Sequence, residues 1–360
     1  MQGRVFPHKW TSDVEIEESK RLAAAGGVGK KHHHVPQVYL RRWADSEGAV
    51  RVTKVSTRDT YVQPTKDIAK KSNLYRISAS DLESDYPELW FEKHMSRIES
   101  DAAAWLGALD ELPDGQIRDR QLIANLGVFV ALQEQRTLKH HAQNLRIEDA
   151  LNRFGRAETV SRVLPWLAPL YGIPYSAERH DELLDEILNV QLLSSERKPR
   201  ALESAIGVWR SQAIPHLVAA RSWWLVSSAG PLVTCDEPTI WLGGPARGRW
   251  EPPAWARSSH MVFPLGPHRL LVLAARKFHP LPPPFELSAS EARQINFEIV
   301  AASHEFGYET PGTSAAAAFE VPPWPPHSPD SAPTFMEAVL EPSRWAQGEG
   351  PPWAVRRWYG

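Results

Sequence analysis

The sequence has almost no cysteine and no long apolar run. Cys235 is the only cysteine among 360 residues, so an intrachain disulfide bond is excluded. No run approaches the roughly 18 apolar residues that a membrane-spanning helix needs. Charged residues also interrupt the first 22 residues, where a signal peptide would need an apolar core. We therefore expect a soluble, cytoplasmic protein that has no membrane partner.

The sequence also lacks the short motifs that identify many common enzyme classes. It contains no P-loop, no dinucleotide-binding glycine pattern, no paired Cys-x-x-Cys and no Gly-x-Ser-x-Gly. None of these familiar sites is therefore available to assign an activity. Candidate functional residues have to be found from charge, from helix faces and from unusual local composition.

The net charge of −2 conceals two segments of opposite sign. Residues 30–76 contain eleven Lys or Arg against four acids, whereas residues 81–114 contain two bases against ten acids. A basic segment attracts phosphate groups, so nucleic acid or a phosphorylated small molecule is a candidate partner. The alternative is that the two segments pair with each other or are merely solvated surfaces.

Local patterns predict three parts and an α+β fold. Residues 1–29 form an N-terminal arm, residues 30–307 a single α+β domain, and residues 308–360 a Pro-rich tail, which we expect to be extended and partly disordered. Strand-like alternation at residues 49–55, 60–63 and 73–77, and again between 223 and 274, brackets a helical middle. We predict short antiparallel strands from both ends of the sequence flanking a central helical block. A closing helix is predicted from Ser288, with Glu291 completing a capping box.

The densest group of chemically capable side chains is the segment KKHHHVPQVYLRRW at residues 30–43. In an extended chain His32 and His34 point to one side and His33 to the other. A neutral imidazole is both a base near pH 7 and a metal ligand. The alternative is an exposed polar run. Nucleases of the His-Asn-His class begin with a similar run, and Asn73 and His94 are candidate partners, although the spacing is longer than in that motif.

Two helices with one apolar face each are predicted in the central block. The first carries apolar residues from Phe91 to Leu109 at steps of three and four. The second stripe, from Leu122, continues onto Gln133 and Arg136, so two polar side chains share an inward face. Glu99, beside the first stripe, is a candidate partner for Arg136. The pair either stabilises the core or holds a catalytic carboxylate in place, and the sequence leaves both open.

A further acid lies in the segment Thr234-Cys235-Asp236-Glu237-Pro238. An acid at a strand end next to a tight turn is well placed to face a cleft. The alternative is that Asp236 binds backbone within its own turn. The neighbouring acids raise the pKa of the Cys235 thiol, so we expect a packed side chain and no thiol chemistry.

These segments together resemble domain-of-unknown-function family 4238, bacterial proteins that open with K-x-H-x-V-P-x-x-Y-L. The match runs from Lys31 and His33 through the pair Ile98-Glu99 and the element Gln133-x-x-Arg136-Thr137 to Asp236 and Pro264–Pro267. It covers roughly residues 30–305. The resemblance singles out His33 from its neighbours and places serine where this chain has Cys235. It implies no known reaction.

The functional prediction follows from this polar set. We expect His33, Glu99, Arg136 and Asp236 to converge on one cleft of a hydrolase that acts on a phosphoester or nucleic acid. The predicted catalytic residues are His33, Glu99 and Asp236, which are also the candidate ligands of a divalent metal ion. The predicted substrate-binding residues are Lys31, Gln133 and Arg136. Two alternatives remain: a non-catalytic ligand- or nucleic-acid-binding protein of a defence or regulatory locus, and a buried polar network that only fixes the fold.

Overall fold

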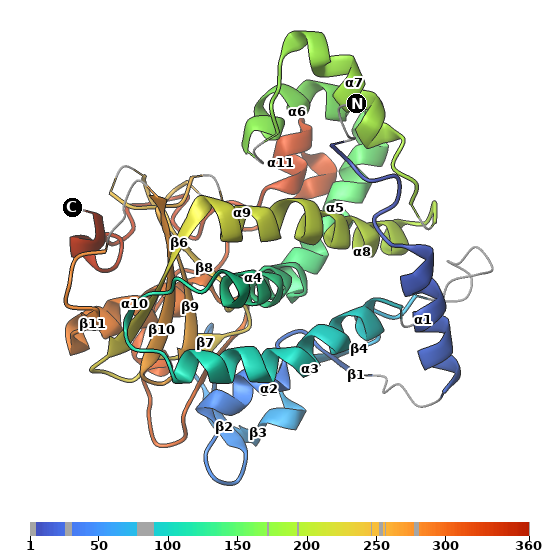
Figure 1. Ribbon diagram of the computed structural model, residues 1–360. Coiled ribbons are helices and arrows are strands. Elements are labelled where there is room, and N and C mark those ends of the chain that lie inside the picture. The colour runs from blue at the N-terminus through green and yellow to red at the C-terminus, as the bar shows by residue number, and fades with distance from the viewer. Residues whose placement is uncertain are drawn as a thin grey trace.

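The structure is a computed structural model, and it describes residues 5–25, 31–77, 90–170, 173–192, 194–245, 247–251, 255, 257–276 and 281–359. The predicted glycine break at residues 26–29, Lys30, and the first part of the acidic segment at 81–89 lie outside the described residues. So does the side chain of His94, one of the candidate nuclease residues. The fold is α+β, as the sequence predicted, with antiparallel sheets and a large helical block (Figure 1).

The larger sheet is built from the second half of the chain. Its strands follow the order β11 (Glu286–Leu287), β6 (Arg221–Ser228), β10 (Arg269–Ala275), β9 (His260–Gly266) and β8 (Ile240–Leu242). The short strand β5 (Gly115–Gln116) also pairs with β6. The pairs β6–β10, β10–β9 and β9–β8 are antiparallel, whereas β11 runs parallel to β6.

A four-stranded sheet joins the two ends of the sequence. Strands β2 (Ala49–Lys54) and β3 (Thr60–Pro64) form a hairpin, β2 then pairs with β12 (Phe306–Glu309), and β12 pairs with β7 (Thr234–Cys235). The sequence predicted antiparallel strands at both ends of the chain, and the structure shows in addition that strands from both ends share this one sheet. The predicted strand at residues 73–77 is wrong. The strand is β4 (Lys70–Ser72), which pairs with β1 (Lys31–His33), and Asn73 ends it because its φ of 54° turns the backbone.

The larger sheet is covered on both faces, and the alternation of side chains along β6 explains why. Trp223 and Leu225 join the core under the central helices, whereas Trp224 and Val226 join a second core beneath α10 (Ala289–Ala302). Successive strand residues point to opposite faces, so a strand that is apolar at every position must be buried on both. Helix α10 begins with the predicted capping box of Ser288 and Glu291.

Helices α3 (Trp90–Asp110) and α4 (Arg120–Gln135) carry the two predicted apolar stripes. Phe91, Met95 and Leu109 are buried on α3, and Leu126 and Phe129 are buried on α4, all in the same core. The helix faces predicted from the spacing are therefore confirmed. Helix α4 starts at Asp119, whose carboxylate accepts the backbone amides of Gln121 and Leu122.

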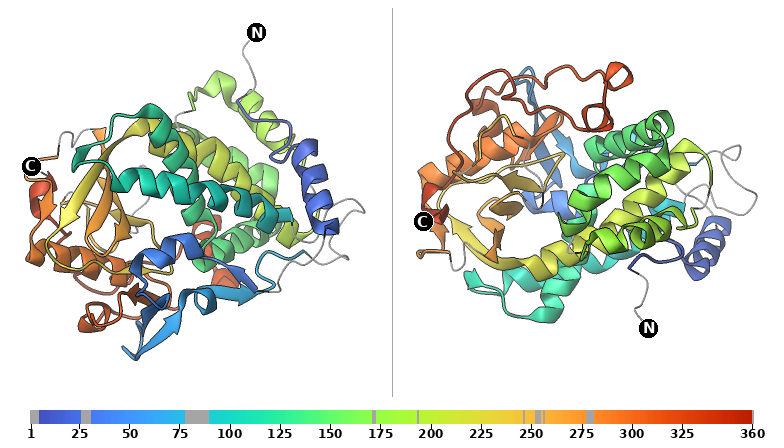
Figure 2. Two further views of the ribbon diagram at one scale, coloured as in Figure 1. Left: turned by 60° about the horizontal axis from the view of Figure 1, so that its bottom comes forward. Right: turned by 90° about the horizontal axis from the view of Figure 1, so that it is seen from above.

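Five further helices form a lobe that lies above the sheets in Figure 1 and beside them in Figure 2. The lobe contains α5 (Leu138–Phe154), α6 (Arg156–Leu170), α7 (His180–Leu188), α8 (Arg197–Val208) and α11 (Phe335–Val339). A π-helical turn at Trp209–Ala213 joins α8 to α9 (Ile214–Ala220), which leads back to the larger sheet. The arm helix α1 (Asp13–Ala24) packs against α3. No helix in the described ranges is both long and apolar enough to cross a membrane.

The tail beyond β12 has little regular secondary structure and is fastened to the domain by aromatic and arginine side chains. The Trp324 indole donates to the carbonyl of Ser303, at a distance of 3.1 Å. Arg344 donates to the carbonyls of Ala301 and Ser303, each at 2.8 Å. Trp358 is buried in the core beneath α10. The tail after β12 therefore completes the core on that face of the sheet.

Candidate functional site

Arg136 ends helix α4 and ties three elements together. Its side chain is fully buried, and its guanidinium donates to the Glu99 carboxylate on α3 and to the backbone carbonyl of His33 on β1. The Tyr75 hydroxyl donates to the carbonyl of Arg136. Burial opposes the cation, but Glu99 and Tyr75 outweigh it and raise the pKa of Arg136. The predicted contact between Glu99 and Arg136 is present as an ion pair between a fully buried guanidinium and a carboxylate that is 27% exposed.

The other predicted substrate residues do not surround a ligand space with it. Gln133 is fully buried and donates to the Phe129 carbonyl of its own helix at 3.2 Å. Its side-chain oxygen has no hydrogen-bond partner among the described residues. Lys31 is exposed on β1. His33 is partly buried, its ring Nε2 lies 3.2 Å from the side-chain nitrogen of Gln37, and burial lowers its pKa.

His32 and His34 lie inward while His33 lies nearer the surface, as the alternation predicted. The backbone amide of Tyr75 donates to His32 Nδ1 at 3.0 Å, and the two rings stack. Neither ring nitrogen of His34 has a hydrogen-bond partner in the described part of the chain. Burial, with Arg136 nearby, lowers the pKa of His34 to about 3. His34 is therefore a neutral packed side chain at neutral pH.

Asp236 fixes the backbone of the segment that leads into β12. Its carboxylate accepts the amides of His304, Glu305 and Phe306 at 2.8, 2.7 and 3.0 Å. Burial, and then the charge of Glu237, raise the pKa of Asp236 to about 7, while these three amides lower it. Asp236 thus binds backbone, but that of a distant segment and not of its own turn. Cys235 is buried beside it, and burial raises the pKa of the thiol.

Only part of the predicted constellation is therefore assembled. Within the described residues, no hydrogen bond or ion pair joins Asp236 to His33, Glu99 or Arg136. The same residues contain no group of three His, Cys, Asp or Glu side chains that could hold a metal ion. Each of the predicted metal ligands has a different protein partner: Asp236 accepts three backbone amides, Glu99 binds Arg136, and His33 Nε2 lies 3.2 Å from Gln37.

A different histidine lies between two carboxylates at the junction of α4 and α5. His140 Nε2 lies 3.7 Å from Glu134 Oε1, and His140 Nδ1 lies 3.7 Å from Glu237 Oε2. The His140 side chain is 24% exposed, whereas those of Glu134 and Glu237 are 5% and 6% exposed. One partly accessible imidazole is thus held between two buried acids. We refer to Glu134, His140 and Glu237 as the histidine–glutamate cluster.

Local structure holds each member of this cluster in place. Thr137 caps α5 by accepting the His140 amide at 3.3 Å, and its hydroxyl lies 3.2 Å from His140 Nδ1. The indole nitrogens of Trp241 and Trp255 donate to the Glu134 carboxylate at 2.9 Å and 2.6 Å. The Lys139 amide donates to Glu237 at 3.2 Å. The orientation of the imidazole is therefore determined by helix capping and by two fixed carboxylates.

The electrostatics of the cluster favour a protonated imidazole. Burial lowers the pKa of His140, but Glu237 and Glu134 outweigh it and raise the pKa above the ordinary value of 6.5. Burial raises the pKa of Glu134, against the effects of His140 and the two indoles. A histidine and a buried acid whose pKa values are both raised, with a second buried acid in contact, form a typical arrangement for general acid–base chemistry.

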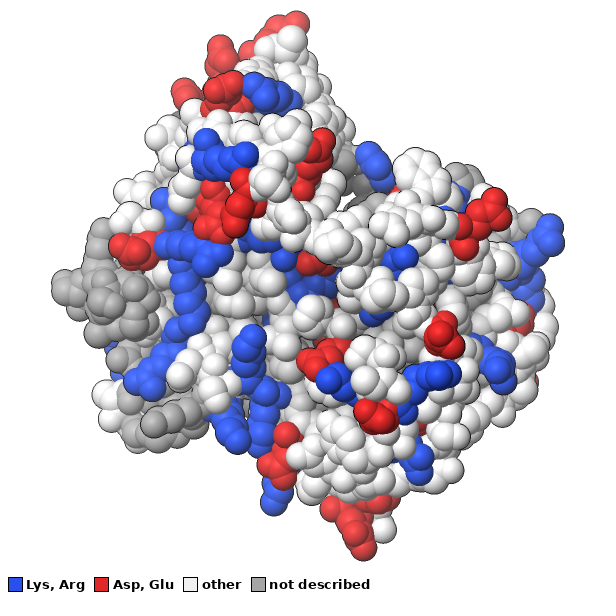
Figure 3. Space-filling view, turned by 180° about the vertical axis from the view of Figure 1, so that it is seen from behind, with Lys and Arg blue, Asp and Glu red and all other residues white. Residues whose placement is uncertain are grey.

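A basic surface lies close to the start of α5. The charges of Lys198, Lys71 and Arg197 contribute, after burial, to a lowering of the pKa of His141 to about 4. Figure 3 shows that Lys and Arg prevail over Asp and Glu on the lower left part of the face seen there. Part of the basic segment predicted from the sequence therefore gathers with residues of α8 on one side of His141.

The sequence prediction singled out two of the segments that form the histidine–glutamate cluster, but not the cluster residues themselves. Glu134 follows Gln133, and Glu237 follows Asp236, so both acids lie in segments that the prediction singled out. The missed signal was Thr137 followed three residues later by His140, which places a histidine in the first turn of a helix. Glu134 was overlooked because it lies about 100° round the helix from the inward stripe.

One comparison with known proteins gives a match. The family model described as "Protein of unknown function (DUF4238)" matches residues 31–312. No curated protein and no solved structure matches the chain. The matched range includes Arg136 and the histidine–glutamate cluster. It also includes β7, which directly precedes Asp236, and β12, whose first amide donates to Asp236.

Proposed function

From the premise that the chain belongs to the DUF4238 family, which has no assigned function, we propose that it is a hydrolase of phosphoesters with His140 as its general acid–base. One observation carries this proposal. His140 is partly exposed and has a buried carboxylate 3.7 Å from each ring nitrogen. A histidine held in this way can keep its proton near neutral pH and release it to a substrate.

The proposed chemistry uses the raised pKa of His140 directly. The imidazolium donates its proton to the leaving oxygen as the ester P–O bond breaks, and the oxygen of water forms the new P–O bond. The neutral imidazole then takes a proton from the added water, which restores the starting state. Glu134 and Glu237 stabilise the cation throughout, and the indoles of Trp241 and Trp255 keep Glu134 in one orientation.

The substrate class is supported by the charges around the cluster. Lys71, Lys198 and Arg197 lie close enough to the neighbouring His141 for their charges to lower its pKa, although Arg197 also pairs with Asp149. Lys139 directly precedes His140. Such a surface attracts an anionic substrate and repels a cationic one. Phosphoesters, including nucleic acid strands, are the anionic hydrolase substrates that fit this charge best.

The direct test is hydrolysis by the purified full chain. The panel is p-nitrophenyl phosphate, bis(p-nitrophenyl) phosphate, and single-stranded DNA and RNA oligonucleotides, measured between pH 5 and 9. We expect His140→Gln to lower the rate on the accepted substrate by about 100-fold or more, because general acid–base catalysis contributes that much. His8→Gln, which changes an exposed imidazole, is the matched control and should keep the wild-type rate.

A second variant separates catalysis from mere folding. Glu237→Gln removes one of the two charges that raise the pKa of His140, so the pH above which activity falls should move to a lower value. A cluster that only stabilises the fold would leave the shape of the pH profile unchanged. Equal rates for wild type and a folded His140→Gln variant, or no hydrolysis of any panel member, would rule the proposal out.

A further inference from the structure

A cavity of about 580 Å³ lies where the start of α4 and the end of α9 meet the larger sheet. It is formed by β5 and the loop after it, the start of α4, the end of α9, the start of β6, and the residue that follows β10. Its lining residues are Gln116, Ile117, Arg118, Arg120, Ile123, Val218, Arg221, Ser222, Trp223 and Arg276. None of the cluster residues is among them, so the cavity is a separate site.

The sequence explains why a space forms there. Strand β5 pairs with the middle of β6 through Gly115 and Gln116, so the chain runs along the edge of the sheet before α4 begins. Gly127 lets α9 pack closely on α4, since a Cβ atom there would lie 2.4 Å from a methyl carbon of Val218. Helix α9 then ends at Ala220, and β6 starts at once with Arg221. The cavity is what remains between these closely joined elements.

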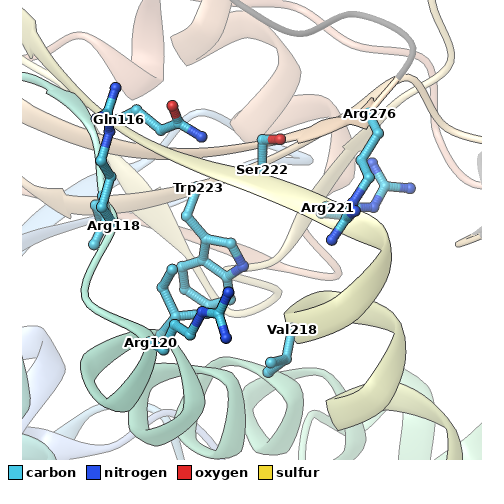
Figure 4. A pocket seen from close by; sticks show the side chains of 10 residues that line it. Gln116, Arg118, Arg120, Val218, Arg221, Ser222, Trp223 and Arg276 are labelled. Carbon is cyan, nitrogen blue, oxygen red and sulfur yellow. The ribbon is translucent and has the colours of Figure 1, made fainter.

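Four arginines and no acid line this cavity. Figure 4 shows Arg118 and Arg120 on one side and Arg221 and Arg276 on the other, with Trp223 between them. Arg118, Arg120 and Arg276 are exposed, and no ion pair or hydrogen bond involves their side chains within the described residues. Three guanidinium groups are therefore available to a ligand.

The fourth arginine, Arg221, is held in place by hydrogen bonds to neutral groups. Arg221 is buried and donates to the carbonyls of Trp255 at 2.6 Å and Ser258 at 3.0 Å. Its other terminal nitrogen donates to the carbonyls of Ser259 and Leu273, each at 3.3 Å, and its Nε donates to Nε2 of His216 at 3.3 Å. All five N–H donors of Arg221 thus have protein partners, so Arg221 offers a ligand its charge and not a hydrogen bond. Burial lowers the pKa of Arg221 to about 10, so it is still a cation at neutral pH. No carboxylate forms an ion pair with Arg221 in the described part of the chain.

The titratable groups of the packed elements do not cancel this charge. Asp119 is engaged as the N-cap of α4, where its carboxylate accepts two backbone amides. Asp114 faces Arg269, at 3.4 Å. Burial and the charge of Arg221 lower the pKa of His216 to about 4, so this imidazole is neutral near pH 7. The charge of Glu134 raises the pKa of Arg221, but the Glu134 carboxylate already accepts hydrogen bonds from the indoles of Trp241 and Trp255.

We propose that this arginine cavity, the space lined by Arg118, Arg120, Arg221 and Arg276, binds a small organic molecule that carries phosphate groups. Arginine matches phosphate through paired N–H donors, and several arginines without partners favour a ligand with more than one negative charge. The volume lies within the 300–1,000 Å³ that is usual for small-molecule sites. Ile117, Val218 and Trp223 add an apolar wall that suits the carbon part of such a ligand.

The test is isothermal titration calorimetry on the full chain at low ionic strength, with ATP as the probe. Tripolyphosphate, citrate and adenosine are titrated in parallel. We expect ATP to bind more tightly than citrate or adenosine, and tripolyphosphate to bind as well. Arg118→Gln and Arg276→Gln should each weaken ATP binding about tenfold, the loss expected for one hydrogen-bonded charge. Both changes are at exposed side chains, so the variants should fold normally.

Arg162→Gln is the matched control, because it removes an arginine that is 76% exposed on α6, in the helical lobe. It should leave ATP binding unchanged. An equal loss in Arg162→Gln would mean non-specific attraction and would overturn the proposal. Citrate binding as tightly as tripolyphosphate would overturn the phosphate assignment. Tighter binding of a single-stranded oligonucleotide than of ATP, weakened by the same cavity variants, would overturn the small-molecule assignment.

This inference goes beyond the proposed hydrolase, and the two fail separately. His140→Gln should keep the wild-type affinity for ATP, because His140 does not line the cavity. Loss of hydrolysis with intact ATP binding therefore tests the cluster alone. No detectable binding of ATP or tripolyphosphate by the wild-type chain at 1 mM ligand, about the weakest affinity such a titration detects, would end the proposal for the cavity.

Discussion

Two arginine-bearing regions of this protein differ in what their charges contact. In the Arg136 junction, which comprises Arg136, Glu99 and His33, the guanidinium binds a carboxylate and a backbone carbonyl inside the core. In the arginine cavity, Arg118, Arg120 and Arg276 have no such partners among the described residues. A charge that the protein already satisfies contributes to the fold, whereas an unsatisfied charge at an open cavity is free to bind.

The largest effect should come from breaking the Arg136 junction. We expect Arg136→Ala to lower the free energy of unfolding by about 4 kcal/mol, because it removes a large, fully buried side chain, leaves a cavity, and deprives Glu99 and the His33 carbonyl of their partner. Arg146→Ala is the comparison, since Arg146 pairs with Glu341 at 2.6 Å but both side chains are partly exposed. It should cost about 1 kcal/mol or less. Urea denaturation of both variants measures the difference, and equal midpoints would contradict the assigned helix face.

A similar loss of stability is expected on changing Asp236. Its carboxylate binds backbone amides, whereas that of Glu99 binds a guanidinium. Asp236→Asn replaces one acceptor oxygen by a donor, so at least one of the amides of residues 304–306 loses its partner. We expect a loss of about 3 kcal/mol in unfolding free energy. The measurement belongs at pH 8, above the pKa of about 7, where the carboxylate is ionised. A variant as stable as wild type would mean that these hydrogen bonds do not hold β12 in place.

His34, packed near Arg136, should make stability depend on acid. Its pKa is lowered to about 3 in the fold against an ordinary 6.5, so the unfolded chain binds a proton more readily. The stability is present above pH 6.5 and is lost as the pH falls towards 3. Between pH 8 and pH 5 this group alone should cost about 2 kcal/mol. His34→Leu should reduce the slope in that range, and an unchanged slope would show that His34 is not buried as a neutral group.

The smallest effect should come from the arginine cavity. Arg118→Gln removes an exposed side chain without a protein partner, so its unfolding free energy should stay within about 0.5 kcal/mol of wild type. The comparison is sharpest if this variant loses ligand affinity while Arg136→Ala loses stability. Thermal denaturation without ligand is the measurement. A loss above about 2 kcal/mol would place Arg118 with the structural arginines.

Helix faces and caps were the most predictable parts of the molecule. The spacing of Phe91 and Met95 on α3, and of Leu126 and Phe129 on α4, follows from the helical repeat alone. The capping box at Ser288 is likewise a local interaction of residues three apart. The wrong strand prediction at residues 73–77 shows the limit of such local patterns. An apolar pattern predicted a strand, but tertiary packing took those side chains into the core without sheet pairing.

The candidate functional residues also fall into two sets: those that a local pattern predicted, and those that only the fold brought together. By itself the sequence determined that Arg136 lies inward, that it has Glu99 as a partner, and that the histidine segment alternates, because each depends on short-range periodicity. Only the tertiary structure decided that Asp236 binds the backbone at residues 304–306. It also decided that His140 lies between two acids that are 103 residues apart in the chain, and that four arginines from separate elements line one cavity. Such meetings depend on how whole helices and sheets pack, and no local repeat in the sequence records that packing.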